Sequence, residues 1–223
     1  MTKEVVIKKL KSKSSKKNLL GMKRFGISGA KMLGVSMLEV RKIAKEIKSD
    51  HQLALDLWSS GIHEARILAG IIADKKKTNS KLMDAWIKDF DSWDICDQVC
   101  LNLFYASPLA YKKASIWAKK QSEFARRAGF ALMAVLAVKE KNGQDKDFEA
   151  FFPLIDKYST DSRNFVKKAV NWALRQIGKR NKNLNKKAII LAKKIAKKED
   201  KSARWIAQDA LRELSGQAVR NRF

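Results

Sequence analysis

Residues 124–137 read FARRAGFALMAVLA, and this stretch decides the fold class. Its apolar residues recur at the three- and four-residue spacing of a buried helix, and its alanines allow close approach of a neighbouring helix. Similar phrases with a basic or capping start recur at intervals of about 30 to 40 residues, a period typical of stacked two-helix repeats. They are EARILAGIIA (64–73), DSWDICDQVCLNLF (91–104), FVKKAVNWALRQI (165–177) and ARWIAQDALREL (203–214). A long helical bundle is the alternative, but five phrases in order favour a solenoid.

Helical patterns follow one another from residue 34 onward, and no segment has the pattern of a strand. Only two prolines and ten glycines interrupt the chain. Residues 1–20 are rich in Lys and Ser with weak periodicity, which predicts a flexible arm or a frayed first helix before a single helical-repeat domain over residues 21–223. The expected helices lie at about 37–48, 51–59, 62–73, 78–89, 93–106, 108–119, 122–140, 146–158, 162–178, 183–197 and 201–214.

The charge balance points to a polyanionic partner. Forty-eight Lys and Arg against 23 Asp and Glu give a formal net charge of +25. Lysines occur all along the predicted array, which fits contact with an extended nucleic acid better than a merely solvated surface. A helical scaffold for an acidic protein is compatible with the charge as well. No apolar run is long enough to span a membrane, and the N-terminus lacks a signal core, so we expect a cytoplasmic protein. We also expect it to be a monomer associated with the nucleoid.

The two cysteines, Cys96 and Cys100, are one helical turn apart. This spacing is poor for a disulfide, and no further Cys or clustered His completes a metal site. We therefore expect buried free thiols and neither a metal nor another cofactor. No acidic cluster suggests a metal-dependent nuclease.

The segment DSWDICDQVC (91–100) contains a carboxylate in an unexpected place. If it forms a helix, Trp93 and Asp97 share a stripe with the two cysteines, whereas Asp94 lies on a more polar face. Asp94 is explained by the positive end of the helix dipole. Asp97 has no such explanation. It could be a partly buried aspartate paired with an Arg or Lys, or a functional group facing a cleft.

Four motifs together resemble the bacterial DNA alkylation repair glycosylases of the AlkD type, which are built from HEAT-like repeats. They are KRFGISGAKMLGV (23–35), SWDICD (92–97), EFARRAGFALMA (123–134) and FVKKAVNWALRQIGKRN (165–181), and the resemblance runs from about Arg24 to Leu214. It implies a curved right-handed solenoid of antiparallel helix pairs with a concave DNA-binding cleft.

The resemblance also implies roles for individual residues. Trp93, Asp97 and Trp172 match cleft residues, and Arg127 matches the cleft arginine, with Arg126 one position away. Phe25 stands where the family has a tyrosine, so a ring is kept and a hydroxyl lost. The further DNA contacts that we expect are Arg24, Arg126, Lys167, Lys168, Arg175, Lys179, Arg180 and Arg204.

The activity implied by the resemblance is hydrolysis of the N-glycosidic bond of cationic N3- and N7-alkylated purines in duplex DNA, without flipping the base into a pocket. A non-catalytic helical-repeat protein that binds damaged or branched DNA is the alternative. Trp93 and Trp172 could also be ordinary core aromatics. The residues expected to have purely structural roles are Trp58, Trp86, Trp117, Trp205, His51 and His63.

Overall fold

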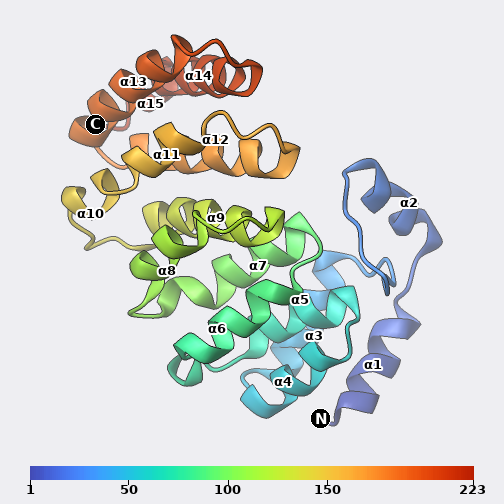
Figure 1. The fold of residues 1–223 in the computed structure, drawn as a ribbon. Helices are drawn as coiled ribbons and strands as arrows, with labels where there is room; N and C mark the ends of the chain where they lie inside the picture. Colours follow the sequence, from blue (N-terminus) through green and yellow to red (C-terminus); the bar gives the residue numbers. More distant parts are fainter. The chain divides into compact units, whose positions relative to one another are not determined.

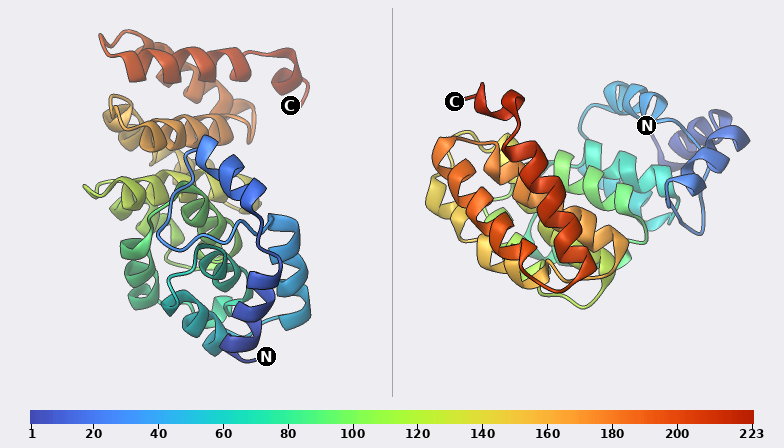
Figure 2. Two further views of the ribbon diagram at one scale, coloured as in Figure 1. Left: turned by 90° about the vertical axis from the view of Figure 1, so that its right-hand side faces the viewer. Right: turned by 90° about the horizontal axis from the view of Figure 1, so that it is seen from above.

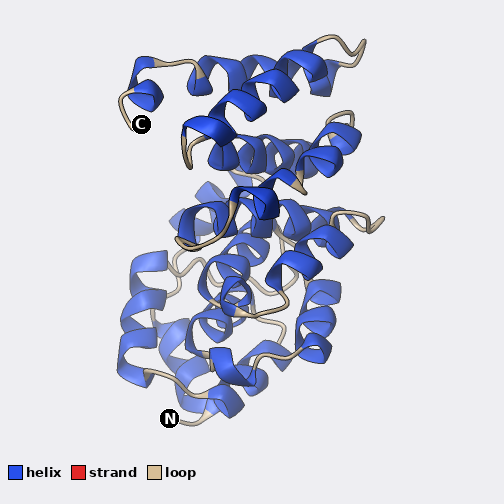
Figure 3. Cartoon of the chain, turned by 90° about the vertical axis from the view of Figure 1, so that its left-hand side faces the viewer, coloured by secondary structure: helices blue, strands red, loops and turns tan.

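The computed structural model describes residues 1–223, and every regular element in it is a helix (Figure 1). Helices make up 72% of the structure and no strand is present, which confirms the all-α prediction. Figure 3 shows the same in its uniform colouring of helices joined by loops. None of the helices combines the length and the apolar character that crossing a bilayer requires. The chain divides into two compact units, residues 1–107 and residues 108–223.

The first unit contains a row of three helices, α3, α5 and α7, in which each packs on the next, while α4 packs beside α5. Their buried residues include Val40, Leu68 and Val99, which occupy the apolar positions of the sequence pattern. The helices of this unit are α1 Lys3–Ser12, α2 Lys16–Arg24, α3 Met37–Ile47, α4 His51–Ser59, α5 His63–Ile72, η1 Lys75–Lys77, α6 Ser80–Trp86, η2 Ile87–Asp89, α7 Trp93–Asn102 and η3 Phe104–Ala106.

The second unit repeats this arrangement with α9, α12 and α14 in one row and α8 and α13 beside them (Figure 2). Helices α8 and α9 approach so closely that a Cβ atom on Gly129 would lie 2.3 Å from the backbone nitrogen of Ala118. The small residues of the FARRAG phrase therefore permit this packing. The bounds are α8 Ala110–Trp117, α9 Glu123–Lys139, α10 Asp145–Glu149, α11 Phe152–Tyr158, α12 Asn164–Gly178, α13 Lys182–Ala196, α14 Lys201–Leu214 and α15 Gln217–Arg220.

Polar contacts between neighbouring helices join residues one repeat apart. In the first unit the Trp58 indole donates to Asp89 across a separation of 31 residues. In the second, the Asn171 amide donates to Asp209 across 38 residues. These separations agree with the interval between the repeated phrases, so the sequence period corresponds to the structural repeat.

Of the two expectations for residues 1–20, a flexible arm or a frayed first helix, the structure shows helices. These residues form α1 and most of α2, and α1 packs against α4 and α5 with Val6 and Leu10 fully buried. The i, i+4 spacing of these two residues gives α1 one narrow apolar stripe among its lysines, which suffices to attach the helix to the unit. The N-terminal segment is therefore a packed part of the first unit.

Two other expectations need correction. The helix expected over 146–158 is divided into α10 and α11, and Pro153 lies in the first turn of α11, where its missing N–H costs nothing. Trp205 is 38% exposed on α14, with the Lys167 ammonium 5.0 Å from its ring centre, and is therefore not a core residue. Trp58, Trp86 and Trp117 are buried as expected.

Candidate functional site

Helix α7 carries the Trp93–Asp97 pair. Ile95, Cys96, Val99 and Cys100 are fully buried and form the packed side of this helix. The two cysteines form no disulfide and both are buried. Trp93 and Asp97 lie one turn apart at the margin of the buried arc, and both side chains are partly exposed. Asp97 is therefore a helix residue on a semi-exposed face and is not enclosed in the core.

The orientation of Trp93 is fixed by the segment before α3. Its indole Nε1 donates a hydrogen bond to the carbonyl oxygen of Phe25 at 3.1 Å. Phe25 is the C-terminal cap of α2 and its side chain is 75% exposed. The structure thus brings Phe25 and Trp93 together within the first unit.

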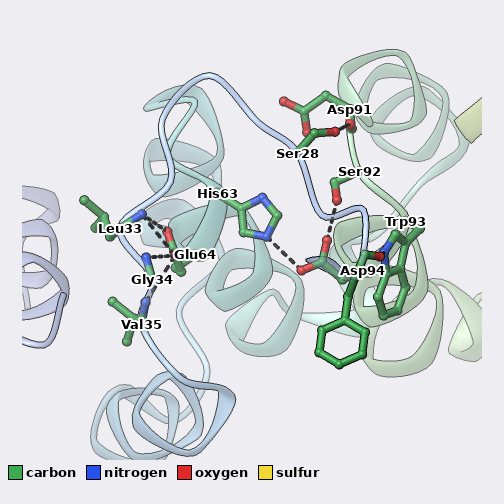
Figure 4. Close-up of polar contacts among 11 residues, drawn as sticks. Ser28, Leu33, Gly34, Val35, His63, Glu64, Asp91, Ser92, Trp93 and Asp94 are labelled. Carbon is green, nitrogen blue, oxygen red and sulfur yellow. Dashed lines mark hydrogen bonds and ion pairs between the residues drawn. The ribbon is translucent and has the colours of Figure 1, made fainter. Parts of the chain in front are cut away.

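Asp94 has a larger role than the dipole complement expected from the sequence. One of its oxygens contacts Nε2 of the buried His63 at 2.8 Å, and the other accepts from the Ser92 hydroxyl at 2.6 Å (Figure 4). His63 is the first residue of α5 and lies one repeat before Asp94. The pair ties the N-termini of α5 and α7 together, so Asp94 is a structural residue.

The pKa values of this pair shift toward the charged forms. Burial by itself would lower the pKa of His63, but the hydrogen bond and charge of Asp94, with Glu64 and Asp91 nearby, outweigh it and raise that pKa. Burial would likewise raise the pKa of Asp94, and the contacts with His63 and Ser92 lower it. Both pKa shifts favour the charged forms, so His63 and Asp94 form an ion pair at the N-terminus of α7.

Glu64 holds the extended segment 26–36 that connects α2 to α3, which we call the strap. The buried Glu64 carboxylate accepts hydrogen bonds from the backbone N–H groups of Leu33, Gly34 and Val35, the shortest at 2.6 Å from Gly34 (Figure 4). The His63 N–H also donates to the carbonyl of Lys31 at 2.9 Å. Sequence reasoning missed this role, although an acidic residue in the first turn of a helix is a recognised anchor for backbone N–H groups.

In the second unit, the two arginines of the FARRAG phrase have different partners. Arg126 forms an ion pair with Asp161 at 2.7 Å and stacks its guanidinium 4.4 Å from the ring centre of Tyr158. Burial would raise the pKa of Asp161, but hydrogen bonds from Arg163 and Arg126 lower it to about 2. Arg126 is 8% exposed, so the expectation that it contacts DNA is replaced by a structural role.

Arg127 lies on another side of α9, and its Nη1 donates to the carbonyl of Phe165, in the first turn of α12, at 2.6 Å. The same helix carries Trp172, which is partly exposed. With the Gln176 amide in the orientation that satisfies both neighbours, its oxygen accepts from Trp172 Nε1 at 3.2 Å and from the Lys179 ammonium at 3.3 Å. Arg127 and Trp172 therefore belong to packed neighbours in the second unit.

The other expected DNA contacts fall into two groups. Arg180 donates to the carbonyls of Ala137, Glu140 and Gly143 and so holds the end of α9 and the loop that follows it. Arg175 and Lys179 form ion pairs with Glu213. These three side chains have structural partners, and Lys167 lies over the Trp205 ring. The cations that remain exposed are Arg24, Lys168 and Arg204.

Comparison with known proteins identifies the family. A family model described as DNA alkylation repair enzyme matches residues 6–214. The chain belongs to this family. The resemblance drawn from the four motifs is thereby confirmed.

One solved structure agrees in fold with this DNA alkylation repair family member. It is described as a new family of proteins related to the HEAT-like repeat DNA glycosylases with affinity for branched DNA structures. It is 23% identical, covers 96% of both chains and has a TM-score of 0.80. An engineered protein (12% identity, 81% and 87% coverage, TM-score 0.44) and a designed armadillo repeat protein (15%, 79% and 92%, 0.38) are more distant. No curated protein matches the sequence.

Proposed function

We propose that this protein is a DNA glycosylase that releases cationic N3- and N7-alkylated purines from duplex DNA. The observation that carries the proposal is the Trp93–Asp97 pair, which lies partly exposed on one face of α7 in a member of the DNA alkylation repair family. The net charge of +25 supports binding of a polyanion. The proposal includes a monomer acting at the nucleoid in the cytoplasm.

The chemistry requires little from the protein at the base. An N3- or N7-alkylated purine already carries a positive charge, so it leaves without a proton from a general acid. The sugar develops oxocarbenium character as the glycosidic bond lengthens. A fixed carboxylate near C1′ stabilises that charge and orients the attacking water, which is the role that we assign to Asp97.

The aromatic residues have supporting roles in this mechanism. In the first unit, Trp93 packs on deoxyribose beside Asp97 and attracts the cationic nucleotide through its ring face. In the second unit, Trp172 offers a ring for the same kind of contact with DNA. Both indole N–H groups are engaged, with the Phe25 carbonyl and the Gln176 side chain, so the rings are held in one orientation. Arg127, the arginine that the resemblance places in the cleft, is 6% exposed and donates to the Phe165 carbonyl, so we assign it, like Arg126, to holding neighbouring helices rather than to a phosphate. Phe25, whose backbone carbonyl accepts from Trp93, offers an exposed ring.

A second candidate function is binding of branched or damaged DNA without chemistry. The structurally similar protein with a TM-score of 0.80 is described as having affinity for branched DNA structures, which supports this alternative. The two functions share the scaffold and the positive charge, and they differ in what Asp97 does. A binder needs no carboxylate at that position, because a negative charge beside phosphates opposes binding.

The test is incubation of the purified protein with a methylated duplex, followed by separation and quantification of free bases. The glycosylase proposal predicts release of 7-methylguanine and 3-methyladenine in proportion to protein and time, above release from the same duplex without protein. Protein that binds the duplex and a four-way junction but releases no base would support the second candidate.

A further inference from the structure

Helix α2 is unusual because none of its nine residues is buried. An isolated helix of that length is marginal in water and normally depends on packing of an apolar face. Helix α2 lies at the edge of the first unit, away from the row of α3, α5 and α7 (Figure 1). Something other than a buried apolar face must therefore keep α2 helical.

The strap holds the N-terminal end of α2, and Trp93 of α7 holds its C-terminal end. At its N-terminus, the Ser15 N–H donates to the Leu33 carbonyl at 3.1 Å and the Asn18 amide donates to the Gly34 carbonyl at 2.9 Å. At its C-terminus, the Phe25 carbonyl accepts from Trp93. Gly34 has φ of +76°, and a Cβ there would lie 2.3 Å from the Ser15 carbonyl oxygen. One side of α2 thus faces the strap and the other side is free.

The free side of α2 has an apolar centre surrounded by cations. Leu20 is 63% exposed. The four positions that surround it on a helix, three and four residues before and after, are Lys16, Lys17, Lys23 and Arg24, and all four are exposed. No ion pair involves these cations, and no acidic residue occurs between Glu4 and Glu39.

We propose that α2 is a DNA-binding element in which Leu20 is an apolar wedge at a base step and the four cations bind phosphates on both sides of the groove. Proteins that bend or open DNA insert a leucine or similar side chain between bases while basic side chains contact the flanking phosphates. The wedge favours DNA in which stacking is already weakened, such as a gapped or branched duplex, because less unstacking energy is needed.

The pattern fits DNA better than a membrane surface. Helices that lie in a lipid interface expose a wide apolar face along several turns. On the free side of α2, Leu20 is the one apolar side chain and is surrounded by cations. This pattern fits insertion of a single side chain between bases while the cations contact phosphates on both sides. The inference rests on the proposed function only in taking DNA as the partner, and it holds whether or not bases are released.

The experiment measures binding of fluorescent duplexes, one intact and one with a single-nucleotide gap, both without alkylation. Leu20→Ala should reduce the preference for the gapped duplex by about fivefold or more while changing affinity for the intact duplex little. Leu38→Ala is the matched control, because Leu38 is 64% exposed on α3. It should bind both duplexes as the wild type does. Circular dichroism verifies that both variants are folded.

Charge is tested by the double substitution Lys16→Gln with Lys17→Gln. It should weaken binding of both duplexes and reduce the slope of log affinity against log salt by roughly 1.8, or 0.9 for each lost phosphate contact. Lys8→Gln with Lys11→Gln removes two exposed charges from α1 and should have a smaller effect.

Equal behaviour of Leu20→Ala and Leu38→Ala on the two duplexes would overturn the wedge. Equal salt slopes for the two lysine pairs would overturn the role of α2. Loss of binding to anionic phosphatidylserine vesicles in Leu20→Ala, with DNA binding unchanged, would assign α2 to membranes. Base release is measured separately on methylated duplex, so failure of the glycosylase proposal and failure of this inference give different results.

Discussion

Removing the Glu64 carboxylate should release the strap. The side chain accepts from three backbone N–H groups, and those of Gly34 and Val35 are buried. In Glu64→Ala each buried donor that loses its partner costs about 1 to 3 kcal/mol, so two of them give roughly 2 to 6 kcal/mol. Glu64→Gln keeps one acceptor oxygen but loses the charge, and a charge-assisted bond is about twice as strong as a neutral one. It should cost about 1 to 2 kcal/mol.

Two measurements check this prediction. Urea unfolding should give a lower free energy of unfolding for Glu64→Ala than for Glu64→Gln, and for both than for the wild type. Hydrogen exchange should show faster exchange of the amides of residues 33–35. Glu46→Gln is the control, because Glu46 forms an exposed ion pair with Lys9 that contributes at most about 1 kcal/mol. Unchanged exchange at residues 33–35 in Glu64→Ala would refute the proposed anchoring of the strap.

Three further predictions follow from the charges. Asp161 has a folded-state pKa of about 2 against an ordinary 3.8, so its contribution to stability is present above pH 3.8 and is lost as the pH falls toward 2. In Asp161→Asn, the free energy of unfolding in urea should therefore depend less on pH over that range than in the wild type. An equal pH dependence would contradict the prediction. Duplex affinity should fall with salt by a log–log slope of about 0.9 per phosphate neutralised, whereas a flat response would exclude a mainly electrostatic interface. Base release should continue in EDTA, because the proposed mechanism uses a carboxylate and water; inhibition reversed by magnesium or zinc would contradict it.

The helices of the repeats were predictable because their apolar spacing is regular. The alanine-rich phrases correspond to α5, α9, α12 and α14, whose bounds lie within about two residues of the predicted ones. A helix near the N-terminus was one of two expectations for residues 1–20, but the packing of α1 was not predicted, because lysine and serine dominate its composition and only Val6 and Leu10 form its buried face. Local pattern is sufficient where a helix has a wide apolar face, and insufficient where two residues carry the packing.

The site was less predictable because its polar partners are one repeat apart in sequence. Asp94 looked like a simple dipole complement, since nothing within its own helix indicates His63 at a separation of 31 residues. The sequence also could not show that Arg126 and Arg127 have structural roles, because both fit the FARRAG phrase. Only the position of Asp161 assigns Arg126 to structure. Once the repeat period is known, searching for opposite charges one period apart would find such pairs.

The His63 contact also changes the control for the catalytic test. Asp94→Asn would weaken a buried ion pair and disturb α7, so it cannot serve as a silent substitution. Asp56 is a better match, because it is a partly exposed aspartate inside helix α4 whose side chain contacts only Gln52 at 3.1 Å. Asp56→Asn removes the same charge from the same unit and should leave base release unchanged.

The most direct test of the central claim is the rate of 7-methylguanine release by Asp97→Asn, measured in single turnover on methylated duplex with Asp56→Asn beside it. The substitution keeps the size of the side chain and removes its charge. The mechanism predicts a rate lower by roughly 10² or more, the scale of one preorganised electrostatic group, with duplex affinity equal to or higher than that of the wild type. Release at the wild-type rate by Asp97→Asn, with or without a lower melting temperature, would show that Asp97 is structural and contradict the mechanism.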